Sequence, residues 1–179
     1  MGLQTQITSN DGINNQIASS FQNVFQMSGG QTTDVADDEY LFVREGGQML
    51  ADDGTIGWGA FASQFKQFIG DGQTYVKGIS FVFQSNAAIS NGTCSLSLME
   101  LDTSGSSAVW TKVSGMTASF NAFGSGSTEG FETFVHIPSS AVLLANNVPY
   151  TICFQNETGS PFRSAFLTCT YTCSFGRES

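Results

Sequence analysis

The stretch from 57 to 175 consists of short runs in which apolar and small polar residues alternate, separated by turns rich in Gly, Ser and Asn. In one run Ile79, Phe81 and Phe83 occupy every second position, and in the last run, 167–175, Leu, Cys, Tyr and Phe alternate with Thr and Ser. A period of two is typical of strands with one buried face. Together with an earlier run at 40–43, about eight such runs predict an all-β fold, an antiparallel β-sandwich or jelly roll. They lie at 40–43, 58–65, 79–84, 95–98, 109–113, 131–137, 150–155 and 167–175.

Residues 1–37 follow a different pattern and are rich in Gln, Asn, Ser and Gly. Apolar residues recur there at helical spacing, at Ile13, Ile17, Phe21, Val24 and Phe25. The spacing predicts a short helix, and the Gly-rich segment 28–33 predicts a hinge after it. We therefore expect an N-terminal arm over 1–37 and a β-sandwich domain over 38–179. A helix with so narrow an apolar stripe needs a partner, either its own domain or a neighbouring subunit.

Acidic residues gather just before the first predicted strand, at Asp34, Asp37, Asp38 and Glu39, and again at Asp52 and Asp53. Neither group has the alternating spacing of a calcium-binding loop. We interpret them as solvated acids in turns, with a weak surface calcium site as the alternative.

Charge is scarce in this chain of 179 residues: 12% of the residues are charged, and the net charge is −9. Surfaces built from Ser, Thr, Asn and Gln are common where partners cover a protein in an assembly. The six bases are scattered, whereas phosphate binding needs clustered positive charge, so we expect neither nucleic acid nor membrane as a partner. The first residues lack the basic and apolar segments of a secretory signal, which predicts synthesis in a cytoplasm.

Four cysteines occur, at 94, 153, 169 and 173. Cys169 and Cys173 share one face of a predicted strand but stand about 13 Å apart, too far for a disulfide. We expect buried free thiols, with a bond from Cys94 to Cys169 or Cys173 as the alternative.

The sequence offers little for catalysis, cofactor binding or metal binding. His136 is the only histidine, and the chain has no Gly-x-Ser-x-Gly motif for a nucleophilic serine. The Gly-rich segment 124–130 lies between two predicted strands, where a phosphate-binding loop would need a following helix. We predict a protein that is not an enzyme and has no cofactor or metal.

Aromatic residues supply the strongest alternative function, because sugars bind to aromatic ring faces. Trp58 and Trp110 are the candidate ligand-binding residues, beside Tyr40; packing in the core or at an interface is the competing interpretation of Trp110. Phe162 stands in a polar loop and is a candidate interface anchor. Asn91-Gly92-Thr93 and Asn156-Glu157-Thr158 match the glycosylation pattern, and we interpret both as turns.

The order of the apolar segments resembles that of a known group of domains. The segments are FASQF at 61–65, VKGISFVF at 76–83, GTCSLSL at 92–98, FVHIP at 134–138 and VLLANNVPYTI at 142–152. They resemble the carbohydrate-binding-module-like jelly rolls of bacterial surface proteins and of phage virion accessory proteins.

The resemblance, together with the small size, the arm and the low charge, implies a phage capsid decoration (cement) protein. Its expected partner is the major capsid protein, its expected assembly a homotrimer, and its expected location the virion. Ile13, Ile17, Phe21, Phe25 and Phe162 are the expected interface residues. The alternative is a carbohydrate-binding module of a tail fibre or surface adhesin, with a glycan as ligand.

Overall fold

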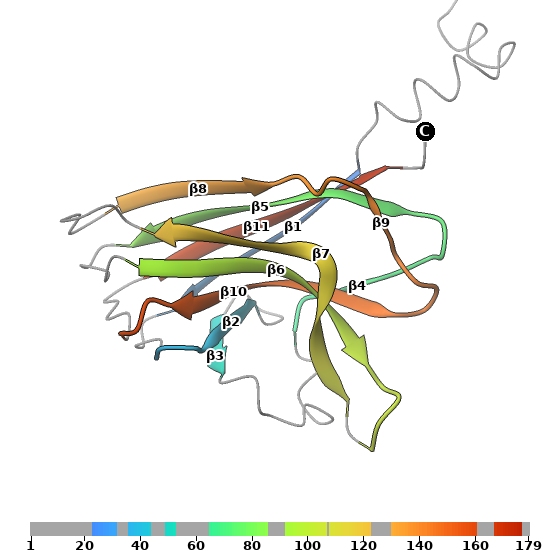
Figure 1. Ribbon diagram of the computed structural model, residues 1–179, viewed down its shortest axis with the longest axis horizontal. Coiled ribbons are helices and arrows are strands. Elements are labelled where there is room, and N and C mark those ends of the chain that lie inside the picture. The colour runs from blue at the N-terminus through green and yellow to red at the C-terminus, as the bar shows by residue number, and fades with distance from the viewer. Residues whose placement is uncertain are drawn as a thin grey trace, which may run out of the picture.

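The computed structural model describes residues 23–31, 36–43, 49–52, 65–85, 92–106, 108–122, 130–160 and 167–176. These residues form strands and contain no helix. The strands make two antiparallel sheets, which Figure 1 shows stacked one above the other. The prediction of an all-β antiparallel fold is confirmed for this part of the chain.

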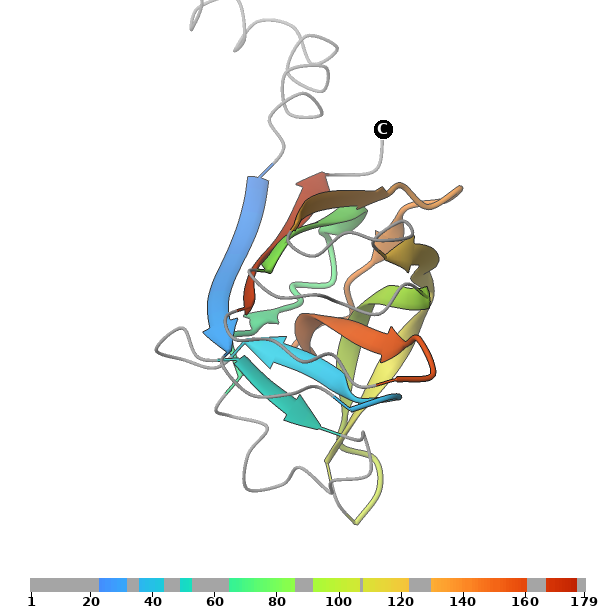
Figure 2. The same cartoon turned by 90° about the vertical axis from the view of Figure 1, so that its left-hand side faces the viewer.

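The first sheet has five strands within the described residues, in the order β1-β11-β5-β8, with the short β9 pairing beside β8 along β5. Their bounds are β1 Asn23–Gln31, β5 Tyr75–Ser85, β8 Gly130–His136, β9 Val142–Leu143 and β11 Leu167–Gly176. Among the described strands, this order leaves β1 and β8 as the two edges of the sheet. Figure 2 shows β1 along one side of the molecule, next to β11.

The second sheet has six described strands in the order β3-β2-β10-β6-β7, with β4 pairing with β10. Their bounds are β2 Tyr40–Val43, β3 Met49–Asp52, β4 Phe68–Ile69, β6 Gly92–Asp102, β7 Val109–Ala122 and β10 Pro149–Glu157. The β6–β7 hairpin twists, and its tip projects beyond the rest of the sheet in both views (Figures 1 and 2). The register of β6 against β7 shifts between Ser97 and Met99.

The main core lies between the two sheets. Ile79 and Phe81 of the first sheet and Leu96 and Phe154 of the second are each at most 1% exposed and belong to one apolar cluster. The rings of Phe81 and Phe154 stack across the gap with centroids 5.1 Å apart. The alternation in the sequence therefore identified these four residues of the shared face, whereas the alternating apolar positions Val135 and Ile137 are exposed instead and Phe134 packs against the core.

A second apolar cluster covers the opposite face of the second sheet. We call it the outer cluster; it comprises Phe42, Phe65, Met99, Trp110 and Cys153, with Tyr40 and Leu101 partly buried against it. Phe42 and Cys153 each lie between neighbours of the main core in sequence, so alternation places them on the other face. Strands β6 and β10 are consequently buried on both faces, as their burial patterns show.

Strand β1 corrects the C-terminal end of the helix predicted near the N-terminus. Val24 and Phe25 belong to β1, which pairs with β11 from Asn23↔Phe175 to Gln31↔Leu167. The spacing of four that suggested a helix also fits a strand, because four is a multiple of the strand period of two. The predicted hinge at 28–33 is likewise wrong for 28–31, which are the end of β1. Ile13, Ile17 and Phe21 lie outside the described residues.

Three further strands were not predicted from the sequence: β3, β4 and β9. Two of them contain only two residues each, so no period can be read from them. The seven predicted strands that fall on described residues all form, while the segment 58–64 lies outside them.

A buried amide ties the first turn to the strand β10. Asn156 is 0% exposed. Its Nδ2 donates to the carbonyls of Ala36 and Ser160, and its Oδ1 accepts from the N–H and the hydroxyl of Thr158. Nearby, Asp37 Oδ1 accepts from Gly159 N. The acids at 37–39 thus lie in a turn, as predicted, and one of them anchors a second turn. The prediction is wrong for Asp52, which pairs with Tyr40 as the last residue of β3.

Two cysteines fall where their surroundings are described. Cys94 is buried in the main core, and Cys153 is a free thiol buried in the outer cluster. Burial raises the pKa of Cys153 to about 12, although the nearby Lys112 acts to lower it. The side chains of Cys169 and Cys173 lie outside the described part, so a bond from either to Cys94 stays a prediction.

Candidate interaction surfaces

Strand β8 presents the most exposed apolar side chains of the described residues. Val135 is 66% exposed and Ile137, just after the strand, is 74% exposed. Val135 lies opposite Ser80 of β5. Just beyond the end of β8, Ile137 Cγ1 lies 3.7 Å from the position that a Cβ would take at Gly78 of β5. We call Val135 and Ile137 the β8 patch. It lies on the outer face of the first sheet, at a sheet edge.

The neighbours of the β8 patch on this face carry no charge among the residues whose side chains are described. Ser80 and Val82 of β5 and Thr133 of β8 occupy the adjacent alternating positions. Exposed apolar side chains at an unpaired strand edge favour contact with another protein surface. The sequence pattern placed Val135 on the face opposite Phe134, but it did not show that Val135 is exposed there.

A second surface combines an aromatic ring with polar groups on the outer face of the second sheet. Lys112 Nζ donates to Gln155 Oε1 at 2.8 Å, lies 3.9 Å from Glu157 Oε1, and stands 5.5 Å from the ring centroid of Tyr40. Gln155 Nε2 in turn donates to Asp38 O. Burial, with the nearby Cys153 and Glu157, raises the pKa of Tyr40, against the hydrogen bond from Gln155.

Trp110 lies beside this surface but is buried. It is 6% exposed and packs edge-on against Phe65, with ring centroids 6.4 Å apart. Its Nε1 is buried and has no hydrogen-bond partner within the described part. This position agrees with the interpretation of Trp110 as a packing residue, and it leaves Tyr40 as the partly exposed aromatic ring of this surface. Trp58 and Phe162 lie outside the described residues.

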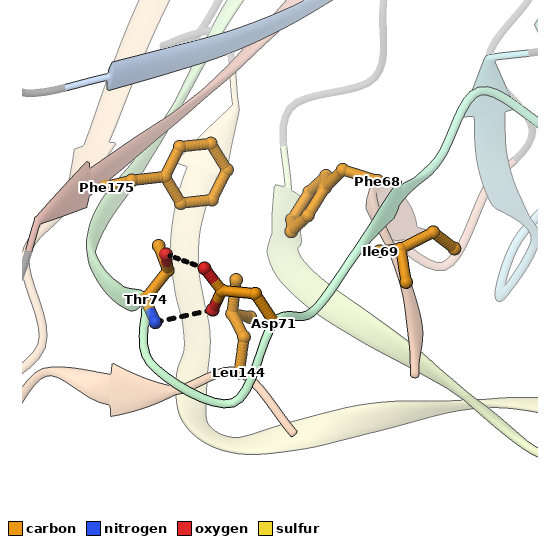
Figure 3. A pocket seen from close by; sticks show the side chains of 6 residues that line it. All are labelled: Phe68, Ile69, Asp71, Thr74, Leu144 and Phe175. Carbon is orange, nitrogen blue, oxygen red and sulfur yellow. Dashed lines mark hydrogen bonds between the residues drawn. The ribbon is translucent and has the colours of Figure 1, made fainter. Parts of the chain in front are cut away.

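A small hollow of about 190 Å³ opens where the β4–β5 connection passes the ends of β9 and β11. Its lining is mostly apolar with one carboxylate, and consists of Phe68, Ile69, Asp71, Thr74, Leu144 and Phe175. In Figure 3 the rings of Phe68 and Phe175 point into the same space, and Asp71 turns toward Thr74. We call it the Asp71 pocket. The sequence showed only a Gly-Asp-Gly turn here.

The described residues hold no arrangement typical of catalysis or metal binding. His136 Nε2 lies 3.1 Å from the carbonyl oxygen of Gly115, which links β8 to β7. The part of the chain with described side chains contains no group of three His, Cys, Asp or Glu that could hold a metal ion. It also contains no helix long and apolar enough to cross a membrane.

No protein-family model and no curated protein matches this sequence. Among solved structures, the chain is similar to a CBM4 protein, with 15% identity, 87% of this chain and 86% of that chain covered, and a TM-score of 0.33. It is also similar to the Eiger TNF of S. frugiperda (8% identity, 83% and 91% covered, TM-score 0.32) and to a decameric BFDV capsid protein (7% identity, 88% and 99% covered, TM-score 0.32). At these TM-scores the likenesses carry no argument about function.

Proposed function

We propose that this protein is a structural protein of a virion, a capsid decoration (cement) protein with a jelly-roll domain that docks on the capsid lattice and does not act as an enzyme. The observation that supports it best is the β8 patch, where Val135 and Ile137 stand exposed at the open edge of a sheet. Burying one such side chain contributes roughly 1.5–3 kcal/mol.

Repetition would turn this modest contact into firm attachment. A homotrimer carries the patch three times in the proposed assembly, and linked contacts bind far more tightly than any one of them. The edge of β8, which pairs with no described strand other than β5, can also add a strand from a partner, with main-chain hydrogen bonds supplying affinity. The surrounding neutral residues suit this, because a −9 molecule meets least electrostatic repulsion where its surface has no acids.

The test uses a double variant, Val135→Ser with Ile137→Ser, and co-sedimentation with particles of the encoding phage that lack the protein. Both side chains are mostly exposed, so the variant should fold with an unchanged melting temperature and lose binding by more than about tenfold. Leu143→Ser is the matched control, since Leu143 is 45% exposed on β9, outside the patch. Equal binding by the double variant and the control would refute the docking role of β8.

Carbohydrate binding is the second candidate function, and the surface around Tyr40 favours it. An accessible ring beside Lys112, Gln155 and Glu157 offers both stacking and hydrogen bonds. Tyr40→Ala should then abolish binding on a glycan array while Val135→Ser with Ile137→Ser leaves it intact. A protein that binds glycans through Tyr40 and ignores capsids would replace the decoration role with this one.

A further inference from the structure

The Asp71 pocket is held open by backbone contacts, which makes it a preformed site. Gly70 N donates to Val148 O at 2.9 Å, and Asn147 N donates to Gly70 O at 2.8 Å. Both backbone groups of Leu144 bond to the same connection: its carbonyl oxygen accepts from Gly72 N, and its N–H donates to Thr74 O. A site ordered in this way loses little conformational entropy when it binds a ligand.

The carboxylate of Asp71 is exposed to solvent in this pocket and accepts hydrogen bonds from neutral groups. Its Oδ1 accepts from the N–H groups of Gln73 and Thr74 at 2.8 and 2.7 Å, and its Oδ2 accepts from the Thr74 hydroxyl at 2.7 Å. All three donors are neutral, and no described Lys or Arg forms an ion pair with it. These hydrogen bonds, the one from Gln73 N foremost, hold the pKa of Asp71 below its usual value.

The remaining walls are apolar and aromatic. Phe68 and Phe175 meet edge-to-face with centroids 5.0 Å apart, and Leu144 is 2% exposed beneath the opening. Ile69, 55% exposed, borders it. Figure 3 shows the carboxylate between these apolar groups and Thr74. A ligand that fits must place a short aliphatic stem against the rings and a positive charge at Asp71.

We propose that the Asp71 pocket binds the side chain of a lysine on the partner surface. A carboxylate oxygen has about two acceptor positions. The N–H groups of Gln73 and Thr74 fill both positions of Oδ1, and the Thr74 hydroxyl fills one position of Oδ2 and leaves the other for a ligand. One position suits the point charge of an ammonium, whereas an arginine fork needs two parallel acceptors. The net charge of −9 also favours a basic partner. The assignment of this lysine to a capsid surface rests on the proposed function; binding by the pocket does not.

The experiment follows backbone NMR shifts while Nα-acetyl-lysine methylamide is added to the full chain. We expect shifts confined to Gly70–Thr74, Leu144 and Phe175, with millimolar affinity. The norleucine derivative, which lacks the ammonium, should bind about two- to fivefold more weakly. The arginine derivative should also bind more weakly. Absence of shifts, equal binding of norleucine, or tighter binding of arginine would each overturn the assignment.

Asp71→Asn should reduce lysine binding to the norleucine level, since it removes the charge and keeps an oxygen for the turn. Asp102→Asn is the matched control, because Asp102 is an exposed turn acid that accepts from Ser104 N in the same manner, away from the pocket. A second measurement needs no variant: lysine binding should disappear as the pH falls through the pKa of Asp71. Loss of binding in Asp102→Asn, or binding that persists in acid, would contradict the proposal.

The capsid arm of the experiment separates this inference from the proposed function. Asp71→Asn should weaken co-sedimentation with particles, and the Val135→Ser, Ile137→Ser variant should keep full lysine binding. If Asp71→Asn loses the probe but sediments normally, the lysine is not on the capsid, while the role of the β8 patch stands.

Discussion

Gly70 is the residue on which the loops around the Asp71 pocket depend most. A Cβ at this position would clash with the carbonyl oxygen of Ala145, which belongs to the backbone and cannot turn aside. We expect Gly70→Ala to lower the free energy of unfolding by about 3–5 kcal/mol, measured by urea denaturation.

Gly115→Ala is the control for this substitution. Gly115 has a φ of 79°, and nothing lies within 4 Å of the position of its Cβ, so only backbone strain of about 1–2 kcal/mol applies. Equal losses for the two variants would mean that close contact with Ala145 does not constrain Gly70.

Cys153 makes the stability of the fold sensitive to alkaline pH. Burial raises its pKa from 9.0 to about 12, so above pH 9.0 the unfolded chain loses this proton while the folded chain keeps it. Stability should therefore fall as the pH rises from 9.0 toward 12, by up to about 1.4 kcal/mol per pH unit from this group.

The variant Cys153→Ala should flatten that slope even though its cavity lowers stability at every pH. Denaturation at several alkaline pH values gives the slope directly. The variant retains Tyr40 and Tyr150, whose raised pKa values act in the same direction, so part of the slope should remain. An unchanged slope would show that the Cys153 thiol is not protected from ionisation.

At the scale of elements, β1 gives the clearest prediction. Its pairing with β11 runs over nine residue pairs, from Asn23 to Gln31. Removing 1–22 should leave the melting temperature nearly unchanged, whereas removing 1–31 should lower it and promote aggregation, because β11 then becomes an open edge.

Thermal unfolding and size-exclusion chromatography of the two truncations test this expectation. Equal stability of both would mean that β1 contributes nothing to the sheet. For the same reason, a truncation that tests the role of the N-terminal segment in capsid binding should stop at residue 22.

The strands that the sequence predicted are those long enough to repeat the alternation of apolar and polar residues more than once. Ile79, Phe81 and Phe83 establish a strand without help from the rest of the chain, whereas the two residues of β4 cannot. Phe21 and Phe25 suggested a helix because a spacing of four is common to both periods. Phe25 lies in a strand because it pairs with Cys173 of β11, and the sequence pattern alone does not show this pairing.

The surfaces were harder to predict than the strands. The Asp71 pocket joins Phe68 to Phe175, which are far apart in the sequence and meet only through the topology. Trp110 alternates with Val109 and so could be placed on the outer face, but its burial depends on Phe65, which belongs to a separate element. Alternation reveals which face a residue occupies, not what covers that face.

At the scale of the whole molecule, the net charge of −9 sets the response to salt. Fifteen acids repel one another in the compact state, and salt screens that repulsion. We expect the melting temperature near neutral pH to rise by a few degrees as sodium chloride increases. The rise should vanish near pH 4.2, the isoelectric point, which serves as the control. A salt effect of equal size at both pH values would mean that salt acts by strengthening the burial of apolar surface and not by screening the repulsion between acids.

The buried amide of Asn156 has a consequence for the choice of expression host. It stands in an Asn-Glu-Thr acceptor sequence, yet every hydrogen-bonding position of its side chain is used inside the fold. In a yeast or mammalian secretory pathway an oligosaccharide added to the nascent chain would occupy that nitrogen before the turn closes. Secreted material should then carry a sugar at Asn156 only on misfolded molecules, and bacterial production avoids the competition altogether.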